Sequence, residues 1–207
     1  AEPELSGTAV PAEIGQSATW TKAASAYLVS SDVSIAKNAV VTVEPGAKVI
    51  FQTGTGATAY GGYSLIVNGE LNAVGTDNDP VYFQGVDDLF KGQTWGAIEL
   101  VNGGRATLRF VSVSQAQYGV NAPNAYNLTV SDSVFTYCGT GLRFAGPATI
   151  EDNRVLYNTT GLVFTADTAS ARDDGSFRLF SHLATVARNT VKGNGNTAST
   201  TEGGFII

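Results

Sequence analysis

Residues 107–113, 129–135, 149–155 and 185–191 read TLRFVSV, TVSDSVF, TIEDNRV and TVARNTV, and these four stretches decide the fold. The first two begin 22 residues apart, and the third begins 20 residues after the second. The likeness continues downstream of each copy, and the fourth copy closes with residues 203–207. A repeat of this length, carrying short apolar pairs bounded by Gly, Asn or small residues, is typical of a solenoid.

The apolar residues of the repeat alternate with polar ones at period 2, which excludes a helix and predicts short strands. Each repeat cannot bury its own apolar face, so stacked coils should align equivalent side chains about 4.8 Å apart in interior columns. The sequence predicts the columns Leu108/Val130/Ile150/Val186, Val113/Phe135/Val155/Val191, Ile98/Val120/Leu142/Leu162/Phe205 and Leu100/Ala122/Phe144/Phe164/Ile207.

The first hundred residues show the same architecture less regularly, with apolar pairs such as Val41/Val43 and Leu65/Val67 separated by turn signals such as Asn68-Gly69. Counting visits to one face gives about six coils with three short strands per coil. We expect one domain over residues 1–207, in which residues 1–32 lead into and cap the coils. Residues 33–207 then form the coils, with insertions near 167–183 and 195–202.

The composition of the chain excludes several classes of function. The chain has 207 residues, 43% of them hydrophobic and 14% charged, with a net charge of −6, and it contains no basic run, so we expect no nucleic-acid partner. No apolar run reaches the roughly 20 residues of a membrane-spanning helix. One cysteine and one histidine leave no zinc cluster.

The chain contains no methionine and starts at Ala1-Glu2-Pro3. Such a start is what signal-peptidase cleavage leaves behind a small residue, and we therefore expect a mature exported protein that is extracellular or on the cell surface. A trimmed chain is the alternative.

Three motifs carry a family resemblance: Glu44-Pro45-Gly46, Ala73-Val74-Gly75-Thr76 and Trp95-Gly96-Ala97-Ile98. With their flanking segments they make the chain resemble exported right-handed parallel β-helix proteins of the pectate-lyase-like superfamily. The resemblance implies an all-β fold, a right-handed parallel β-helix, in agreement with the general right-handedness of parallel crossovers. It leaves function open, because members range from polysaccharide lyases to adhesins and surface-structure repeats.

The resemblance directs attention to carboxylates, because lyases of the superfamily abstract a proton from a uronate with calcium and a basic side chain. Asp132 and Asp152 fall in one column with Arg188 next to them, an arrangement that suits a cation or an acidic sugar. The same residues stand at a coil corner, where polar side chains commonly satisfy turn backbone groups. The acidic ligand set of the lyases cannot be assembled, so we predict no catalytic residue, no metal and no cofactor, and enzymatic activity stays uncertain.

Tyr118, Tyr137 and Tyr157 form a possible glycan-stacking strip, although a tyrosine pair on neighbouring strands is more often a stabilising contact. Cys138 falls in the corner column Ala116/Cys138/Asn158/Asn194 and is predicted to be a buried small residue. Asn127 starts an accessible glycosylation sequon.

The apolar strand Phe205-Ile206-Ile207 predicts assembly, because an uncapped solenoid end exposes strand N–H and C=O groups above an apolar core. Val10, Ile14 and Trp20 are the predicted complementary face of a second copy, in a homo-oligomer or head-to-tail polymer. The alternatives are further residues beyond the chain or coverage by its inserted loops. The leading hypothesis is an exported structural protein that forms a filament or surface layer. The others are a glycan-binding or adhesion module and, less favoured, a polysaccharide lyase.

Overall fold

The computed structural model describes residues 6–54, 62–86, 92–123, 127–164 and 184–195, and the backbone of residues 205–206. In these residues the only regular elements are short strands, which form three sheets. No helix long and apolar enough to cross a bilayer occurs in the described part of the chain.

Successive strands belong to sheets 1, 2 and 3 in turn. From β4 on, each strand pairs with the strand that lies three places before it in the chain. Sheet 1 contains β1 (Thr8–Ala9), β4 (Tyr27–Val29), β7 (Lys48–Phe51), β10 (Val81–Gly85), β13 (Val111–Ser114), β16 (Val134–Thr136), β19 (Arg154–Leu156) and β22 (Thr190–Lys192). Sheet 2 contains β2 (Glu13–Ile14), β5 (Val33–Ile35), β8 (Leu65–Val67), β11 (Trp95–Leu100), β14 (Ala116–Ala122), β17 (Thr140–Phe144), β20 (Thr160–Phe164) and β23 (Phe205–Ile206). Sheet 3 contains β3 (Ala18–Trp20), β6 (Val40–Val43), β9 (Glu70–Val74), β12 (Arg105–Arg109), β15 (Asn127–Ser131), β18 (Ala148–Glu151) and β21 (Thr185–Ala187).

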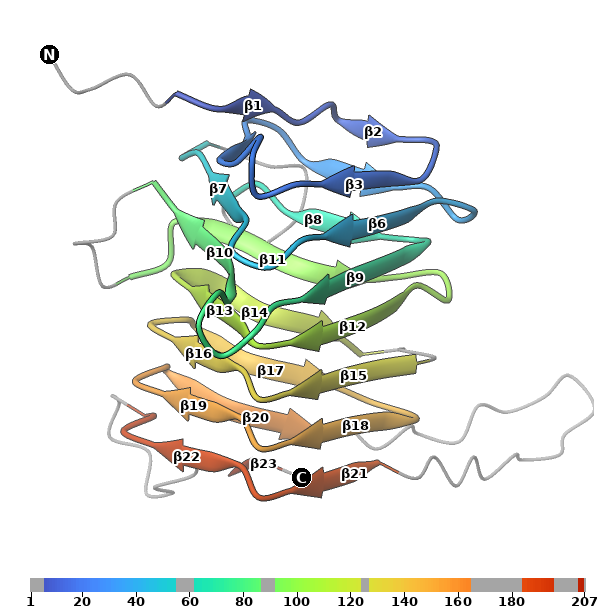
Figure 1. Ribbon diagram of the computed structural model, residues 1–207. Helices are drawn as coiled ribbons and strands as arrows, with labels where there is room; N and C mark the ends of the chain where they lie inside the picture. The colour runs from blue at the N-terminus through green and yellow to red at the C-terminus, as the bar shows by residue number, and fades with distance from the viewer. Residues whose placement is uncertain are drawn as a thin grey trace, which may run out of the picture.

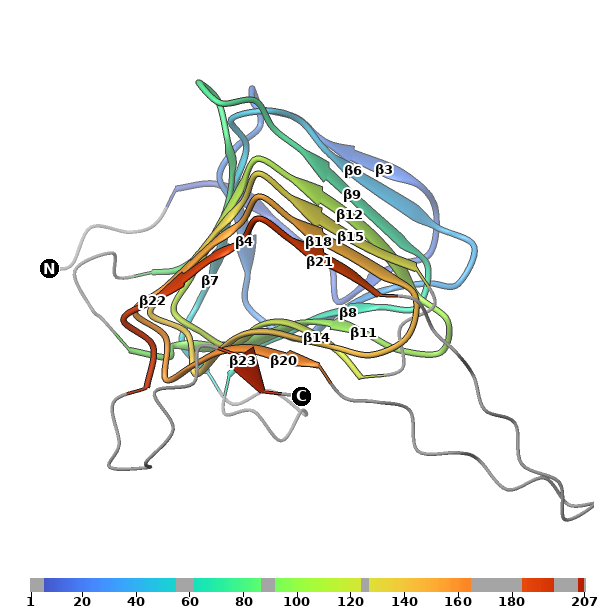
Figure 2. The same ribbon diagram turned by 90° about the horizontal axis from the view of Figure 1, so that it is seen from below.

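The coils stack along one axis, with β1, β2 and β3 at one end and β21, β22 and β23 at the other (Figure 1). Viewed along that axis, the three sheets form the sides of a triangle (Figure 2). Neighbouring strands run parallel, as in the pairs of β12 with β15 and of β14 with β17. The expected parallel β-helix with three strands per coil is therefore confirmed.

The predicted columns are confirmed in the described residues. Val130 pairs with Leu108 on one side and Ile150 on the other, and Ile150 pairs with Val186. This column continues to the other end of the stack through Ala73, Val43 and Trp20. The columns through Val113 and through Ile98 also run as predicted. In the fourth column, Ala122, Phe144 and Phe164 are in register, and Ile207 lies outside the described residues.

The coil count differs from the expectation. In the described residues, sheets of eight, eight and seven strands make about seven coils, one more than the six that the sequence predicts. The additional coil comes from the segment before residue 33, where β1, β2 and β3 already pair with β4, β5 and β6. These three strands contain only two or three residues each, and the segment shows isolated apolar residues rather than the alternating pattern of the repeat. The sequence pattern therefore did not predict them. The expected insertion at 167–183 lies outside the described residues, as does 196–202 of the second insertion.

Two bends in each of the last four coils place residues in the left-handed region of backbone conformation. Positive φ angles recur five residues apart at Phe110/Gln115, Asp132/Tyr137, Asp152/Tyr157 and Arg188/Gly193. Seven of these eight residues carry a side chain, and each such residue costs roughly 1 kcal/mol or more. The first bend turns the chain from sheet 3 to sheet 1, and the second turns it from sheet 1 to sheet 2.

Asparagine side chains inside the coil satisfy the backbone groups that these bends leave unpaired. Oδ1 of Asn153 accepts the backbone N–H of Ser133 at 3.0 Å, while its Nδ2 donates to the carbonyl oxygen of Val130 at 2.9 Å. One coil further, Oδ1 of Asn189 accepts the N–H of Asn153 at 2.9 Å, and its Nδ2 donates to the carbonyl oxygen of Ile150 at 2.7 Å. Each carboxamide therefore bonds two backbone groups of the preceding coil and offsets the cost of burying them.

The second bend repeats the same arrangement. Oδ1 of Asn158 accepts the N–H of Cys138 at 2.8 Å, and Nδ2 of Asn158 donates to the carbonyl oxygen of Phe135 at 3.1 Å. Asn194 in turn accepts the N–H of Asn158 at 2.8 Å and donates to the carbonyl oxygen of Val155 at 2.8 Å. We call these two rows, Ser133/Asn153/Asn189 and Cys138/Asn158/Asn194, the asparagine ladders.

A pair of identical substitutions in one column tests whether stacking supplies the stability. Val130 is fully buried between two coils, whereas Val186, in the outermost coil, is 36% exposed. We expect Val130→Ala to lower the free energy of unfolding by about 2–3 kcal/mol, and Val186→Ala by less than about 1 kcal/mol. Urea denaturation followed by circular dichroism measures both. Equal losses would contradict the stacked-column account.

Candidate functional site

The tyrosine strip is only partly assembled. Tyr137 and Tyr157 occupy the second bend on neighbouring coils, and their rings stack with centroids 6.0 Å apart and an interplanar angle of 15°. Tyr157 is 57% exposed. Tyr118 instead lies within β14, in register with Thr140, three residues beyond the bend position of its own coil. Two of the three predicted tyrosines therefore form one surface feature.

A groove of about 360 Å³ runs along this bend. Its lining consists of Gln93, Tyr137, Cys138, Tyr157, Asn158, Thr159, Gly193 and Gly195. At Gly193, where φ is +67°, a Cβ would lie 2.8 Å from Cδ1 of Tyr157, so the glycine lets the backbone pass directly against the ring. Tyr157 therefore lies between Tyr137, on whose ring it stacks, and the backbone at Gly193.

Cys138 lies at the inner wall of the groove and is 1% exposed. Burial raises the pKa of its thiol to about 12. Because the thiolate is the nucleophilic form, this thiol is inert at neutral pH. The prediction that Cys138 is a buried small residue is confirmed.

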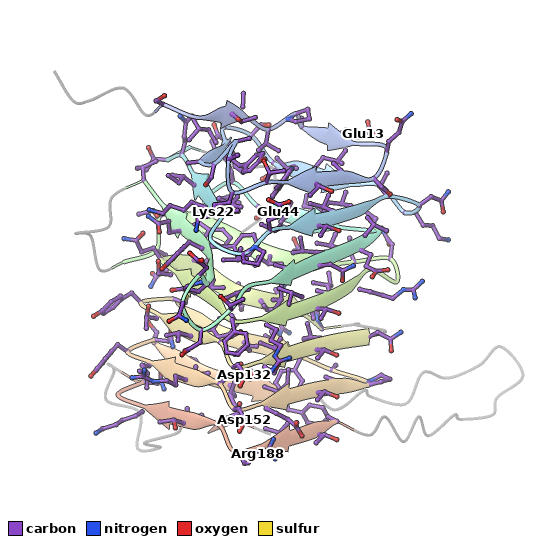
Figure 3. All side chains as sticks on the ribbon, in the orientation of Figure 1. Glu13, Lys22, Glu44, Asp132, Asp152 and Arg188 are labelled. Atoms are coloured by element: carbon purple, nitrogen blue, oxygen red, sulfur yellow. The ribbon has the colours of Figure 1, made fainter. Side chains whose placement is uncertain are left out.

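The acidic column at the first bend is a set of ion pairs. Figure 3 shows Asp132, Asp152 and Arg188 on successive coils. Nε of Arg188 donates to Oδ1 of Asp152 at 2.8 Å, and its Nη2 donates to Oδ2 at 2.7 Å. The same Nη2 reaches Glu151 at 3.2 Å, and Arg109 pairs with Asp132 at 3.0 Å.

These contacts change the charge that the column presents. The bidentate bond to Arg188 lowers the pKa of Asp152, and the same pairing raises the pKa of Arg188. Both aspartates are already neutralised by arginines, which leaves little charge for a cation or for catalysis. In the described residues there is also no group of three or more His, Cys, Asp and Glu side chains that could hold a metal ion, and His182 lies outside them. In the structure the column links successive coils through ion pairs, and binding of a cation or an acidic sugar there stays a prediction.

Two further features have no counterpart in the sequence analysis. Nζ of Lys22 bonds Oδ1 of Asp79 at 2.7 Å, and the Lys22 backbone N–H donates to Oε2 of Glu44 at 3.0 Å. These two contacts join three successive coils near the N-terminal end, where Figure 3 labels Lys22 and Glu44. A second groove, of about 310 Å³, lies at the third corner. It is lined by Lys37, Asn38, Ala39, Val40, Asn68, Gly69, Glu70, Gly103 and Arg105. These residues are up to 68 positions apart in the chain, and only the coil register brings them together.

The predicted assembly residues fall into two groups. Val10, Ile14 and Trp20 are 5–7% exposed and belong to the continuous core. Phe205 and Ile206 form β23, in register with Leu162 and Val163. Their side chains, and all of Ile207, lie outside the described residues. The role of both groups in assembly stays a prediction. Asn127 is exposed. A second glycosylation sequon, Asn158-Thr159-Thr160, begins at Asn158, which is buried.

The first bend generates a pH prediction. Arg188 holds the folded-state pKa of Asp152 below the unfolded value of about 3.9. The ion pair therefore stabilises the fold above about pH 4. This contribution to stability is lost as the pH falls through the folded-state pKa of Asp152. NMR titration of the Asp152 side-chain carboxyl should give a pKa below the usual range. Arg188→Gln should return it toward about 3.9, and Arg188→Lys should return it only partly. A normal pKa in the unaltered protein would contradict the observed pairing.

Comparisons with known proteins agree with this geometry. A search of curated proteins and a search of solved structures found no match. One family model, described as right handed beta helix region, matches residues 81–206, which is more than half of the chain and includes the regular repeats and both asparagine ladders. The chain belongs to the right-handed β-helix family.

Proposed function

We propose that this chain is a structural β-helix module of an exported or cell-surface protein, and that it assembles end to end into a filament or surface layer. We call the outer edge of β21 and β22, residues 185–192, the open end. The observation that carries the proposal is the exposure of Val186. It is 36% exposed, although Ile150 and Val130 in the same column are fully buried.

The open end combines an apolar surface with unpaired strand edges. In the described residues β21 pairs only with β18, and β22 pairs only with β19. Val191, which continues a fully buried column, is half-buried. An exposed strand edge above apolar side chains favours addition of another strand, so the surface has the properties of an assembly face.

The other end of the stack differs. Trp20 stacks on Tyr27 with ring centroids 5.2 Å apart, and both side chains are 5% exposed. The first coil therefore offers strand edges to a second copy but little exposed apolar area. Within the part of the chain that the structure describes, the sheets also contain unequal numbers of strands, with seven in sheet 3 and eight in the others. A head-to-tail contact that joins β22 to β1 and β23 to β2 of a second copy leaves one strand position of sheet 3 unfilled at each junction.

Assembly through the open end predicts a specific effect of charge. Val186→Asp places a carboxylate over the exposed column, and its desolvation on docking should weaken association by at least about tenfold. Particle mass measured by light scattering over a range of protein concentrations should increase for the unaltered chain and stay monomeric for the variant. In negative-stain electron microscopy the unaltered chain should form long threads, and Val186→Asp should abolish them.

Val74→Asp is the matched control. Val74 is also an exposed valine, at 41%, but it lies at the end of β9 in the middle of the stack. This variant should assemble like the unaltered chain. A monomeric mass for the unaltered chain at every concentration would contradict the proposal, and equal loss in both variants would show that assembly does not use the open end.

A second candidate function is glycan binding at the groove beside Tyr137 and Tyr157. The observation that favours it is a 360 Å³ groove bordered by a tyrosine that is 57% exposed. Aromatic rings and amides are common contacts for sugars, but here the tyrosine faces are turned toward Tyr137 and Gly193. A glycan would thus be held by ring edges and hydroxyl groups. Polysaccharide lyase activity is the least supported function, because Asp132 and Asp152 are paired with arginines.

The glycan function predicts that Tyr157→Ala reduces binding. In affinity electrophoresis on gels containing pectin, alginate or xylan, we expect the variant to lose retention by at least about fivefold in Kd, since a central aromatic contact commonly contributes more than 1 kcal/mol. Tyr82→Ala is the control, because Tyr82 lies on sheet 1 beside Lys48, away from the groove. Identical mobility with and without every polysaccharide would reject this candidate.

A further inference from the structure

The asparagine ladders have a direction. We call each asparagine of a ladder, together with the backbone groups that it bonds, a rung. In every rung the carboxamide of one coil bonds the backbone of the coil before it, toward the N-terminal end. Each buried rung is therefore completed by the coil that follows. Asn153 and Asn158 are 1% and 3% exposed, since Asn189 and Asn194 cover them.

The last rung repeats this geometry at the open end. By the register of the ladders, the N–H of Asn189 and the carbonyl oxygen of Val186 correspond to the groups of Asn153 and Ile150 that Asn189 itself bonds. The N–H of Asn194 and the carbonyl oxygen of Val191 correspond in the same way to those of Asn158 and Val155. Within the described residues, neither N–H has a hydrogen-bond acceptor.

Among the described residues, the open end thus presents two identical sockets, one at Asn189 and one at Asn194. Each socket offers a backbone N–H beside a backbone carbonyl oxygen. A carboxamide fits such a pair, because its oxygen accepts and its nitrogen donates. A hydroxyl reproduces only half of this contact: at the same ladder position, Oγ of Ser133 accepts the N–H of Val111 in the preceding coil at 3.1 Å but donates to the carbonyl oxygen of Ser131 in its own coil. A carboxylate lacks the donor.

We infer that the open end takes a β-helix coil that carries two asparagines separated by four residues. This names the partner of the assembly face and rests on the function proposed above. The spacing is that of Asn153/Asn158 and of Asn189/Asn194, which are five positions apart. The incoming coil also needs an apolar residue over Val186 and another over Val191, as Ile150 and Val155 show in the preceding coil.

The first coil of this chain is a poor match. The register through Thr8, Tyr27 and Val49 to Val191 places Ser6 and Pro11 at the two ladder positions. Serine lacks the amide donor, and proline has neither donor nor acceptor in its side chain. A second copy that docks by this coil, as in the proposed assembly, pairs its strands with β22 and β23 but leaves both sockets incomplete. A coil that resembles residues 145–164 would fill the strand edges and both sockets, and it is therefore the occupant that fits best.

The test extends the full chain with such a coil. A copy of residues 145–164 placed directly after Ile207 continues the order of sheets, because its three strands would follow β23 as β18, β19 and β20 follow β17. The matched control carries leucine at the two positions that copy Asn153 and Asn158, so that volume is kept and the carboxamides are lost. Hydrogen exchange of the Asn189 and Asn194 amides, measured by NMR in dilute protein, is the readout.

We expect the asparagine extension to slow exchange of both amides by at least about tenfold relative to the unextended chain, and the leucine extension to leave them within about threefold. Equal protection by both extensions would overturn the inference while leaving the assembly face intact. Protection by neither would overturn the assembly face as well. Protection of both amides that rises with the concentration of the unextended chain and reaches the level given by the asparagine extension would also overturn the inference, because the first coil of a second copy carries neither carboxamide.

Discussion

The structure depends on one constraint, which is that every buried backbone N–H and carbonyl group at the bends of the coil needs a partner. Sheets satisfy the strands, but positive φ angles at positions such as Asp152 and Tyr157 turn backbone groups inward, away from the sheets. Asn153 and Asn158 satisfy these groups from within the core. Each of these carboxamides bonds the coil before it, so the bends at Ser133 and Cys138 are completed by the next coil, and the bends at Asn153 and Asn158 by the one after that.

This constraint explains which parts of the fold the sequence predicts. Polar residues recur at fixed positions of the repeat, and the apolar columns through Val130 and Phe135 follow from counting along the chain. The coil formed by β1, β2 and β3 was missed, because its strands are only two or three residues long and show no repeat. Its pairing with β4, β5 and β6 is set by register and is not visible in local pattern.

Candidate sites were less predictable, because they depend on side-chain contacts rather than on register alone. Counting placed Asp132, Asp152 and Arg188 in one column, but the bidentate geometry that neutralises Asp152 appears only in the structure. Tyr118 was grouped with Tyr137 and Tyr157 by proximity in the repeat, yet it belongs to the strand that follows the bend. The link between Lys22, Glu44 and Asp79 joins three coils through residues 57 positions apart and left no local signal.

The account's central claim is that the asparagine ladders are complete inside the stack and unfinished at the open end. Amide hydrogen exchange in dilute, unextended protein tests it most directly. The account predicts that the amides of Asn153 and Asn158, which have carboxamide acceptors, exchange slowly, whereas those of Asn189 and Asn194 exchange at least about a hundredfold faster. Equal, slow exchange at all four positions would contradict it, because another group would then already complete the last rung.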